Sequence, residues 1–82
     1  MPLYYFDIED QDDLSRDDTG IDCTSRDAIR NAAVDALPDL ARDLILGDEH
    51  HTIVVLVRDE AGRKIYRASL TVDAAWLDGP ER

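Results

Sequence analysis

The longest amphipathic pattern in the chain covers residues 24–47, TSRDAIRNAAVDALPDLARDLILG. Its apolar residues recur every three or four positions, which places them along one stripe of an α-helix; they are Ile29, Ala32, Ala33, Ala36, Leu37, Leu40, Ala41 and Leu44. The residues between them are mostly charged, so we expect the helix to lie on a sheet rather than inside a core. Thr24, followed by Asp27, predicts the N-terminal cap, and Gly47 predicts the end.

Pro38 falls inside this predicted helix. A proline there removes one backbone hydrogen bond and costs about 3 kcal/mol in a straight helix. The helix therefore either kinks at Pro38 or divides into residues 24–37 and a second helix that starts at Pro38. Because the apolar stripe keeps its phase on both sides of the proline, we favour one kinked helix.

Alternating and β-branched runs predict four strands, at residues 3–9, 14–16, 52–57 and 64–72. The first run places Tyr4, Phe6 and Ile8 on the core face. Residues 10–13 and 17–20 are predicted turns, and Gly62 favours a short hairpin loop over residues 58–63. The fold class is therefore α+β: a two-layer ββαββ arrangement with the helix on a three- or four-stranded antiparallel sheet. Residues 1–77 form a single domain, and residues 78–82 form a frayed C-terminal tail.

The hairpin loop also decides which side chains share a face. If Asp59 and Arg63 close it, Val54 and Leu56 face the helix, and an apolar patch forms on the other side of the sheet. That candidate interface consists of Leu3, Tyr5, Ile53, Val55, Val57, Ile65 and Trp76. We expect it to be covered either by Trp76 and Leu77 or by a second subunit, because monomers rarely expose large apolar patches. A shift of one residue in the pairing would swap the two faces.

Charge narrows the choice of partners. Nineteen acidic residues against nine basic ones give a formal net charge of −10, which opposes direct binding to nucleic acid and to anionic membranes and favours a basic protein partner. No apolar run is long enough for a membrane span, and the first residues do not look like a signal peptide, so we expect a cytoplasmic protein. Cys23 is the single cysteine and forms no internal disulfide; we expect it reduced and half-buried beside the start of the helix.

No candidate site carries recognisable chemistry. Adjacent His50 and His51 point to opposite faces of a strand, so we assign them to a link after the helix rather than to a metal site. The acidic residues near the N-terminus lack the ligand spacing of a calcium loop, and we expect them to form a solvated edge; they are Asp7, Glu9, Asp10, Asp12, Asp13, Asp17 and Asp18. No nucleophile has a base partner. We therefore expect no enzymatic activity, no catalytic residue, no metal and no cofactor.

Several short motifs follow one another along nearly the whole chain. They are the opening Met1-Pro2-Leu3-Tyr4-Tyr5-Phe6-Asp7, the turn from Arg16 to Gly20, the segment Leu37-Pro38-Asp39-Leu40-Ala41-Arg42-Asp43, and the hairpin from Val57 to Arg63. In this order the chain resembles a bacterial domain-of-unknown-function family of small acidic proteins that open with M-P-x-Y-[YF]-F-D. The resemblance implies that Pro38 is a tolerated part of the helix, and it implies no activity or ligand.

These observations favour a non-enzymatic protein-interaction or regulatory module whose partner is a second copy or a basic protein. The alternative is an antitoxin-like or nucleic-acid-associated regulator whose acidic surface binds a basic partner. A small-molecule or metal binder is a third hypothesis, supported only by the acidic turns and the histidines.

Overall fold

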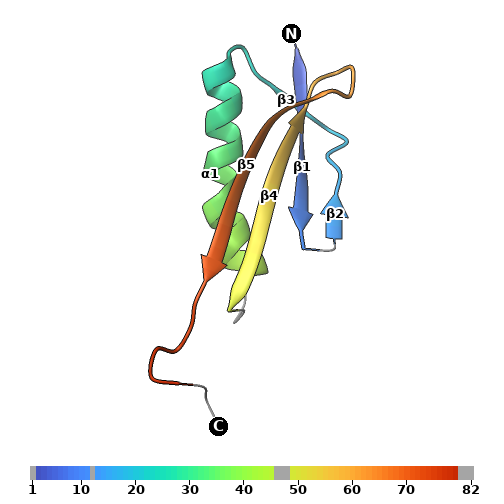
Figure 1. Ribbon diagram of the computed structural model, residues 1–82. Helices are drawn as coiled ribbons and strands as arrows, with labels where there is room; N and C mark the ends of the chain where they lie inside the picture. Colours follow the sequence, from blue (N-terminus) through green and yellow to red (C-terminus); the bar gives the residue numbers. More distant parts are fainter. Residues whose placement is uncertain (1, 12, 46–48, 80–82) are drawn as a thin grey trace.

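The computed structural model describes residues 2–11, 13–45 and 49–79. Along the chain, the elements are β1 (Leu3–Asp10), β2 (Asp13–Ser15), β3 (Ile21–Asp22), α1 (Arg26–Leu44), β4 (His50–Arg58) and β5 (Lys64–Asp73). The strands form one antiparallel sheet in the order β2-β1-β4-β5, and β3 pairs with the start of β1. Helix α1 covers one face of this sheet (Figure 1). We call that face the helix side and the opposite one the reverse face.

The α+β class and the antiparallel sheet under one helix are confirmed, whereas the strand count is higher than predicted. The additional strand is β3, in a segment that we expected only to lead into the helix. Ile21 and Asp22 pair with Tyr4 and Leu3. The preceding Gly20 has φ of +82°, which turns the chain back along β1 and confirms the turn predicted at this glycine.

Helix α1 begins one residue later than its predicted cap suggested. Ser25 is the N-cap: its backbone is extended (φ −154°, ψ 163°), and its Oγ accepts a hydrogen bond from the Ala28 amide at 3.1 Å. This is the geometry that a capping side chain requires. The prediction of Thr24 as the cap was therefore wrong by one position.

The helix continues through Pro38 as a single element, so it does not divide there. Pro38 is exposed, which places the missing hydrogen bond on the solvent side of the helix. The kink at Pro38 stays a prediction. At the C-terminal end, the Ile45 amide donates to the Ala41 carbonyl at 2.9 Å, and the predicted end at Gly47 lies outside the described residues.

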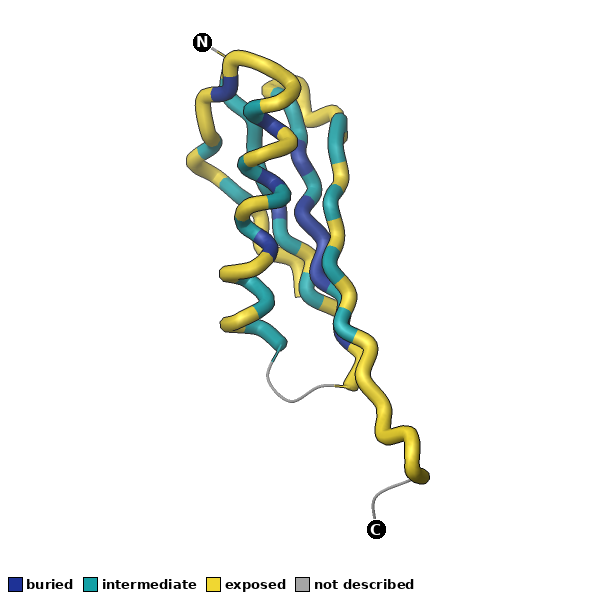
Figure 2. The backbone as a smooth tube through the Cα atoms, turned by 90° about the vertical axis from the view of Figure 1, so that its left-hand side faces the viewer, coloured by how far each residue is buried: buried dark blue, intermediate teal, exposed yellow. Residues whose placement is uncertain are grey.

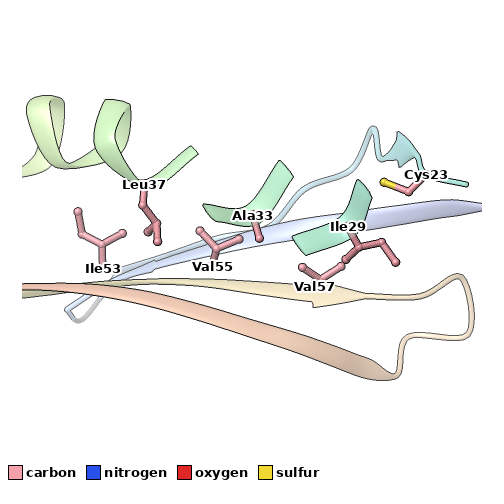
Figure 3. Close-up of a cluster of buried hydrophobic side chains, with 7 residues drawn as sticks. All are labelled: Cys23, Ile29, Ala33, Leu37, Ile53, Val55 and Val57. Atoms are coloured by element: carbon pink, nitrogen blue, oxygen red, sulfur yellow. The ribbon is translucent and has the colours of Figure 1, made fainter. Parts of the chain in front are cut away.

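The core lies between α1 and the middle of the sheet. Three helix side chains spaced four residues apart, Ile29, Ala33 and Leu37, face the β4 side chains, and the buried Cys23 closes one end of the cluster (Figure 3). The β4 members are Ile53, Val55 and Val57, each 0% exposed. Tyr4, Phe6 and Ile8 pack against this cluster from β1, which confirms their predicted core face.

The predicted pairing of β4 with β5 was wrong by one residue. The loop closes as expected: the Asp59 amide donates to the Arg63 carbonyl at 2.9 Å, Gly62 has φ of +84°, and Arg58 pairs with Lys64. The next pair, however, joins Val57 to Tyr66, because Ile65 is an extra residue at an irregularity in the ladder. One inserted residue moves all later side chains of a strand to the opposite face.

This correction changes the candidate interface. Ile53, Val55 and Val57 lie under the helix and are fully buried, so they cannot contact a partner, and Ile65 is partly buried against the same core. Val54 and Leu56 take their places on the reverse face. Leu3 and Tyr5 lie on the reverse face as expected. Most of the apolar residues that we predicted to form an exposed patch therefore belong to the core.

Candidate functional site

Three features stand out outside the core: a buried ion pair on the reverse face, a cleft near the start of the helix, and the outer side of β5. The ion pair joins Asp7 of β1 to Arg58 at the end of β4. Arg58 Nε donates to Asp7 Oδ2 at 2.7 Å, and Nη2 donates to Oδ1 at 3.2 Å. The two side chains are only 7% and 14% exposed. Two parallel bonds of this kind fix orientation as well as charge.

Asp17 completes this network from the segment between β2 and β3. Its carboxylate accepts hydrogen bonds from the Phe6 amide at 3.1 Å and from the Gly20 amide at 3.1 Å, and its own amide donates to Asp7 Oδ1 at 2.9 Å. Arg58 Nη2 also donates to the Asp17 carbonyl at 3.0 Å. Asp7 and Asp17 therefore do not belong to the solvated acidic edge, because their oxygens are occupied by protein donors.

Tyr5 lies over the same network. Its ring is 4.9 Å from the Arg58 guanidinium carbon, a cation–π contact. A Cβ added to Gly20 would lie 3.0 Å from this ring, so a larger residue would have to push the ring aside and would also be strained at the φ of +82°. The interface residue predicted at Tyr5 is thus engaged with its own chain.

The electrostatics of this network are those of a structural site. Burial acts to raise the pKa of Asp7, but the hydrogen bonds from Arg58 and from the Asp17 amide outweigh it and lower that pKa. Burial also acts to raise the pKa of Asp17, but hydrogen bonds from the Phe6, Gly20 and Thr19 amides outweigh it and lower that pKa. The bond to Asp7 raises the pKa of Arg58. Each charge has its partners, so the network holds the chain in place.

His50 and His51 are the first residues of β4 rather than a link after the helix. As expected from their adjacency, they point to opposite faces: His51 is buried and its Nε2 lies against Asp10 Oδ1, whereas His50 is exposed with Nδ1 at 4.0 Å from Asp73. Within the described part of the chain, no three histidine, cysteine, aspartate or glutamate side chains gather in a way that could hold a metal ion. Cys23 is buried, and burial together with the Asp22 carboxylate raises the pKa of its thiol.

A cleft of about 360 Å³ opens between the first turns of α1 and the hairpin of β4 and β5. Aromatic and apolar side chains line it together with three arginines and two aspartates; they are Tyr4, Arg26, Asp27, Ile29, Arg30, Asp59, Arg63, Ile65 and Tyr66. The Asp59 carboxylate is bound to its own loop, where Oδ1 accepts from the Ala61 and Arg63 amides at 3.0 and 2.9 Å. Arg26 makes no hydrogen bond or ion pair with any described residue.

This cleft was not predicted from the sequence, although the helix carried a signal. Arg26 and Arg30 are four residues apart in the first two turns of α1. Cations are disfavoured there by the positive end of the helix dipole, whereas acidic residues are favoured. Two arginines on one side of the first turns therefore do not serve to stabilise the helix, and they indicate another role for this surface.

The third feature is the outer side of β5, which we call the β5 edge. Strand β5 is ten residues long and stands last in the sheet, and no described strand pairs with its outer side (Figure 1). Its residues alternate between half-buried and exposed, and the chain then continues as an exposed tail over residues 74–79 (Figure 2). In that tail, Trp76 is 69% exposed and Leu77 is 98% exposed, so neither covers the sheet as one of our two alternatives required.

Fold and site together define a small two-layer α+β protein with a buried ion pair between β1 and β4, a cleft near the start of the helix and an open sheet edge. The chain belongs to the family described as a domain of unknown function, DUF6894, whose model matches residues 3–71. The tail with Trp76 lies beyond the matched range. Neither the curated proteins nor the solved structures contain a match to the chain. Over the described residues, no helix has the length and apolar character needed to cross a membrane.

Proposed function

We propose that the chain is a non-enzymatic protein-interaction module that binds an extended segment of a protein partner along the β5 edge. The carrying observation is that β5 has ten residues and a whole side without a strand partner among the described residues. Unpaired backbone amides and carbonyls at a sheet edge form a template for an added strand, which is a recurrent mode of peptide recognition.

The distribution of side chains supports this proposal. Proteins usually protect an exposed edge with a proline, a short strand or a dense row of charges. Strand β5 contains no proline, and its middle residues Ala68, Ser69 and Leu70 are small or uncharged. The acidic residues gather at the opposite edge of the sheet, where β2 and β3 flank β1. An approaching strand therefore meets little electrostatic repulsion at β5.

The test compares what the full chain and two variants capture from a cell extract. The edge variant Arg67→Asp/Ser69→Asp places two acidic groups on β5, and the control Asn31→Asp/Arg42→Asp makes the same charge change on the exposed side of α1. We expect proteins retained by the wild-type chain and the control to be lost by the edge variant. Circular dichroism confirms that each variant is folded. Capture of the same proteins by the edge variant would refute the proposal.

A second candidate rests on the acidic edge. Glu9, Asp13 and Asp22 are exposed on β1, β2 and β3, and Asp18 is exposed between β2 and β3. This charge favours a basic partner such as the toxin of an antitoxin-like regulator. Neutralising Asp13, Asp18 and Asp22 to asparagine would then weaken binding and reduce its dependence on salt. If the captured partners are unaffected by these changes but are lost with the edge variant, the first candidate stands and this one fails.

A further inference from the structure

We propose that the partner at the β5 edge is a second copy of this chain, and that Trp76 of each copy inserts into the cleft of the other. The inference deepens the proposed function and rests on it. Three features that have no role in the isolated chain are explained together: the open β5 edge, the exposed Trp76 and the arginine-rimmed cleft.

The register follows from the alternation of β5. Tyr66, Ala68, Leu70 and Val72 share the helix side, because their β4 partners Val57, Val55, Ile53 and His51 lie there. In a two-fold dimer the same surface meets itself, so residues directly opposite one another belong to the same face. An axis at Ser69 satisfies this condition and pairs almost the whole strand. It places Tyr66 opposite Val72 and Ala68 opposite Leu70.

Charge and space both fit this register. On the reverse face, Arg67 lies opposite Thr71 and diagonally across from Asp73, a favourable cross-strand neighbour. The strongly acidic edges lie at the two far ends of the joined sheet. Strands are about 4.8 Å apart, so helices that cover β4 and β5 stand roughly 10–14 Å from each other. Packed helices need about 8–10 Å, and both therefore fit on the same side.

The same register brings each tail to the cleft of the other copy. The Ala74 amide still donates to the Glu49 carbonyl at 2.7 Å, so the chain remains strand-like to this residue. Ala74 then lies opposite Lys64 of the second copy, and Trp76 lies about 7 Å further along. Continued alternation turns Trp76 to the helix side. The cleft opens there, at Arg63, Ile65 and Tyr66.

The cleft suits an indole ring. Ile29, Ile65 and the two tyrosines supply apolar and aromatic surface, and the guanidinium of Arg26, unpaired among the described residues, stands at the rim. An arginine stacked on tryptophan gains a cation–π contact that strengthens as water is excluded. Buried tryptophans flanked by arginines are also frequent anchors of protein interfaces. Insertion would bury Trp76, one of the two large apolar side chains that the tail exposes.

A charge-swap experiment tests the axis. Ser69 is exposed, and in the dimer it faces Ser69 of the second copy. We expect the purified wild-type chain to sediment as a dimer and the variants Ser69→Asp and Ser69→Lys each to sediment as monomers, because like charges meet at the axis. A mixture of the two variants regains the dimer. Dimerisation of either variant alone as tight as that of the wild type would overturn the proposed axis.

Trp76 reports the second half of the proposal, because it is the only tryptophan in the chain. We expect its emission to shift to the blue and its quenching by acrylamide to fall as wild-type protein is concentrated, with no change in Ser69→Asp. Trp76→Ala weakens the dimer about tenfold or more, whereas Trp76→Phe weakens it less. A dimer whose tryptophan stays fully quenchable would refute the insertion.

The outcomes separate the two proposals. If the purified wild-type chain stays monomeric at high concentration while the edge variant still loses captured proteins, the second copy is refuted and strand addition stands. If the edge variant dimerises as tightly as the wild type and also retains every captured protein, strand addition itself is refuted.

Discussion

Asp7 has a structural role that its neighbours in sequence do not indicate. It sits among acidic residues on the reverse face of β1, yet it is 5% exposed and held by Arg58 and by the Asp17 amide. A buried ion pair contributes little net stability when compared with apolar residues of the same size. Removing one partner is costly, because the other charge stays buried without compensation.

Asp7→Ala therefore destabilises the fold by about 3–5 kcal/mol, the usual cost of breaking a buried pair. The matched control is Asp39→Ala, which breaks the pair of Asp39 and Arg42, whose side chains are 77% and 75% exposed. Its effect stays within about 0.5 kcal/mol. Urea unfolding followed by circular dichroism measures both. Equal costs for the two variants would show that the Asp7 network does not support the fold.

Acid acts on the same network. The pKa of Asp7 and that of Asp17 lie below the ordinary value of 3.8 in the folded chain, so their stabilisation is complete above that value. It disappears as the pH falls from the ordinary value through the folded pKa, because the unfolded chain takes up protons more readily than the folded chain in this range. We expect the cost of Asp7→Ala to be constant between about pH 5 and 7, a range that lies above the ordinary aspartate titration.

Below about pH 4 that cost should shrink, since the Asp7 carboxyl of the unfolded wild-type chain takes up a proton there more readily than that of the folded chain. Urea midpoints of wild type and variant at successive pH values measure the difference, which cancels the general effect of acid on the other carboxyl groups. A cost that is the same at about pH 2.5 and at neutral pH would contradict the assignment.

At the scale of elements, helix α1 lacks one backbone hydrogen bond because of Pro38. Pro38 is exposed inside a 19-residue helix and cannot donate to the carbonyl four residues earlier. Pro38→Ala restores this hydrogen bond at the expense of a more flexible unfolded chain. We expect a net gain of roughly 1–2 kcal/mol, since the restored bond and the relieved clash outweigh that added flexibility. Thermal unfolding measures it, with Asp35→Ala on the same exposed side as control. An unchanged or lower midpoint would show that the helix depends on a bend at Pro38.

The helix and the main strands were predictable because each is encoded by a local period. The stripe through Ile29, Ala33 and Leu37 and the β-branched run of β4 need no information from elsewhere in the chain. The register between β4 and β5 cannot be predicted from the period of each strand alone. The loop residues Asp59 and Gly62 behave as predicted, but nothing in the sequence marks Ile65 as an additional residue, and one residue decides which face meets the helix.

The site residues were hidden for a related reason. The partners Asp7 and Arg58 are 51 positions apart, and only the pairing of β1 with β4 brings them together. An aspartate in an alternating strand next to other acidic residues is typical of a solvated surface. The cleft was hidden in the same way, because its arginines on the helix and its residues on the hairpin are far apart in sequence and meet only in the folded chain.

At the scale of the whole molecule, the excess of negative charge sets how the fold responds to salt. A net charge of −10 on 82 residues makes the folded chain repel itself, and salt screens this repulsion. Raising NaCl from about 0.02 to 0.5 M should increase the thermal midpoint by about 4–8 °C, which corresponds to roughly 1 kcal/mol for a domain of this size. A variant with Asp13, Asp18 and Asp22 changed to asparagine should respond less. A midpoint that falls with salt would contradict this expectation.

The irregular step in the hairpin has a consequence for engineering. Arg58 pairs with Lys64 and Val57 with Tyr66, so a chain lacking Ile65 would keep every other partner of β5 and form an uninterrupted ladder. The strand therefore carries one residue that its pairing does not need, and this residue forms part of the wall of the cleft. Deleting Ile65 therefore tests the apolar wall of the cleft separately from the strand pairing of the hairpin. The shortened hairpin should still fold, while the cleft loses the apolar wall against which an indole ring would rest.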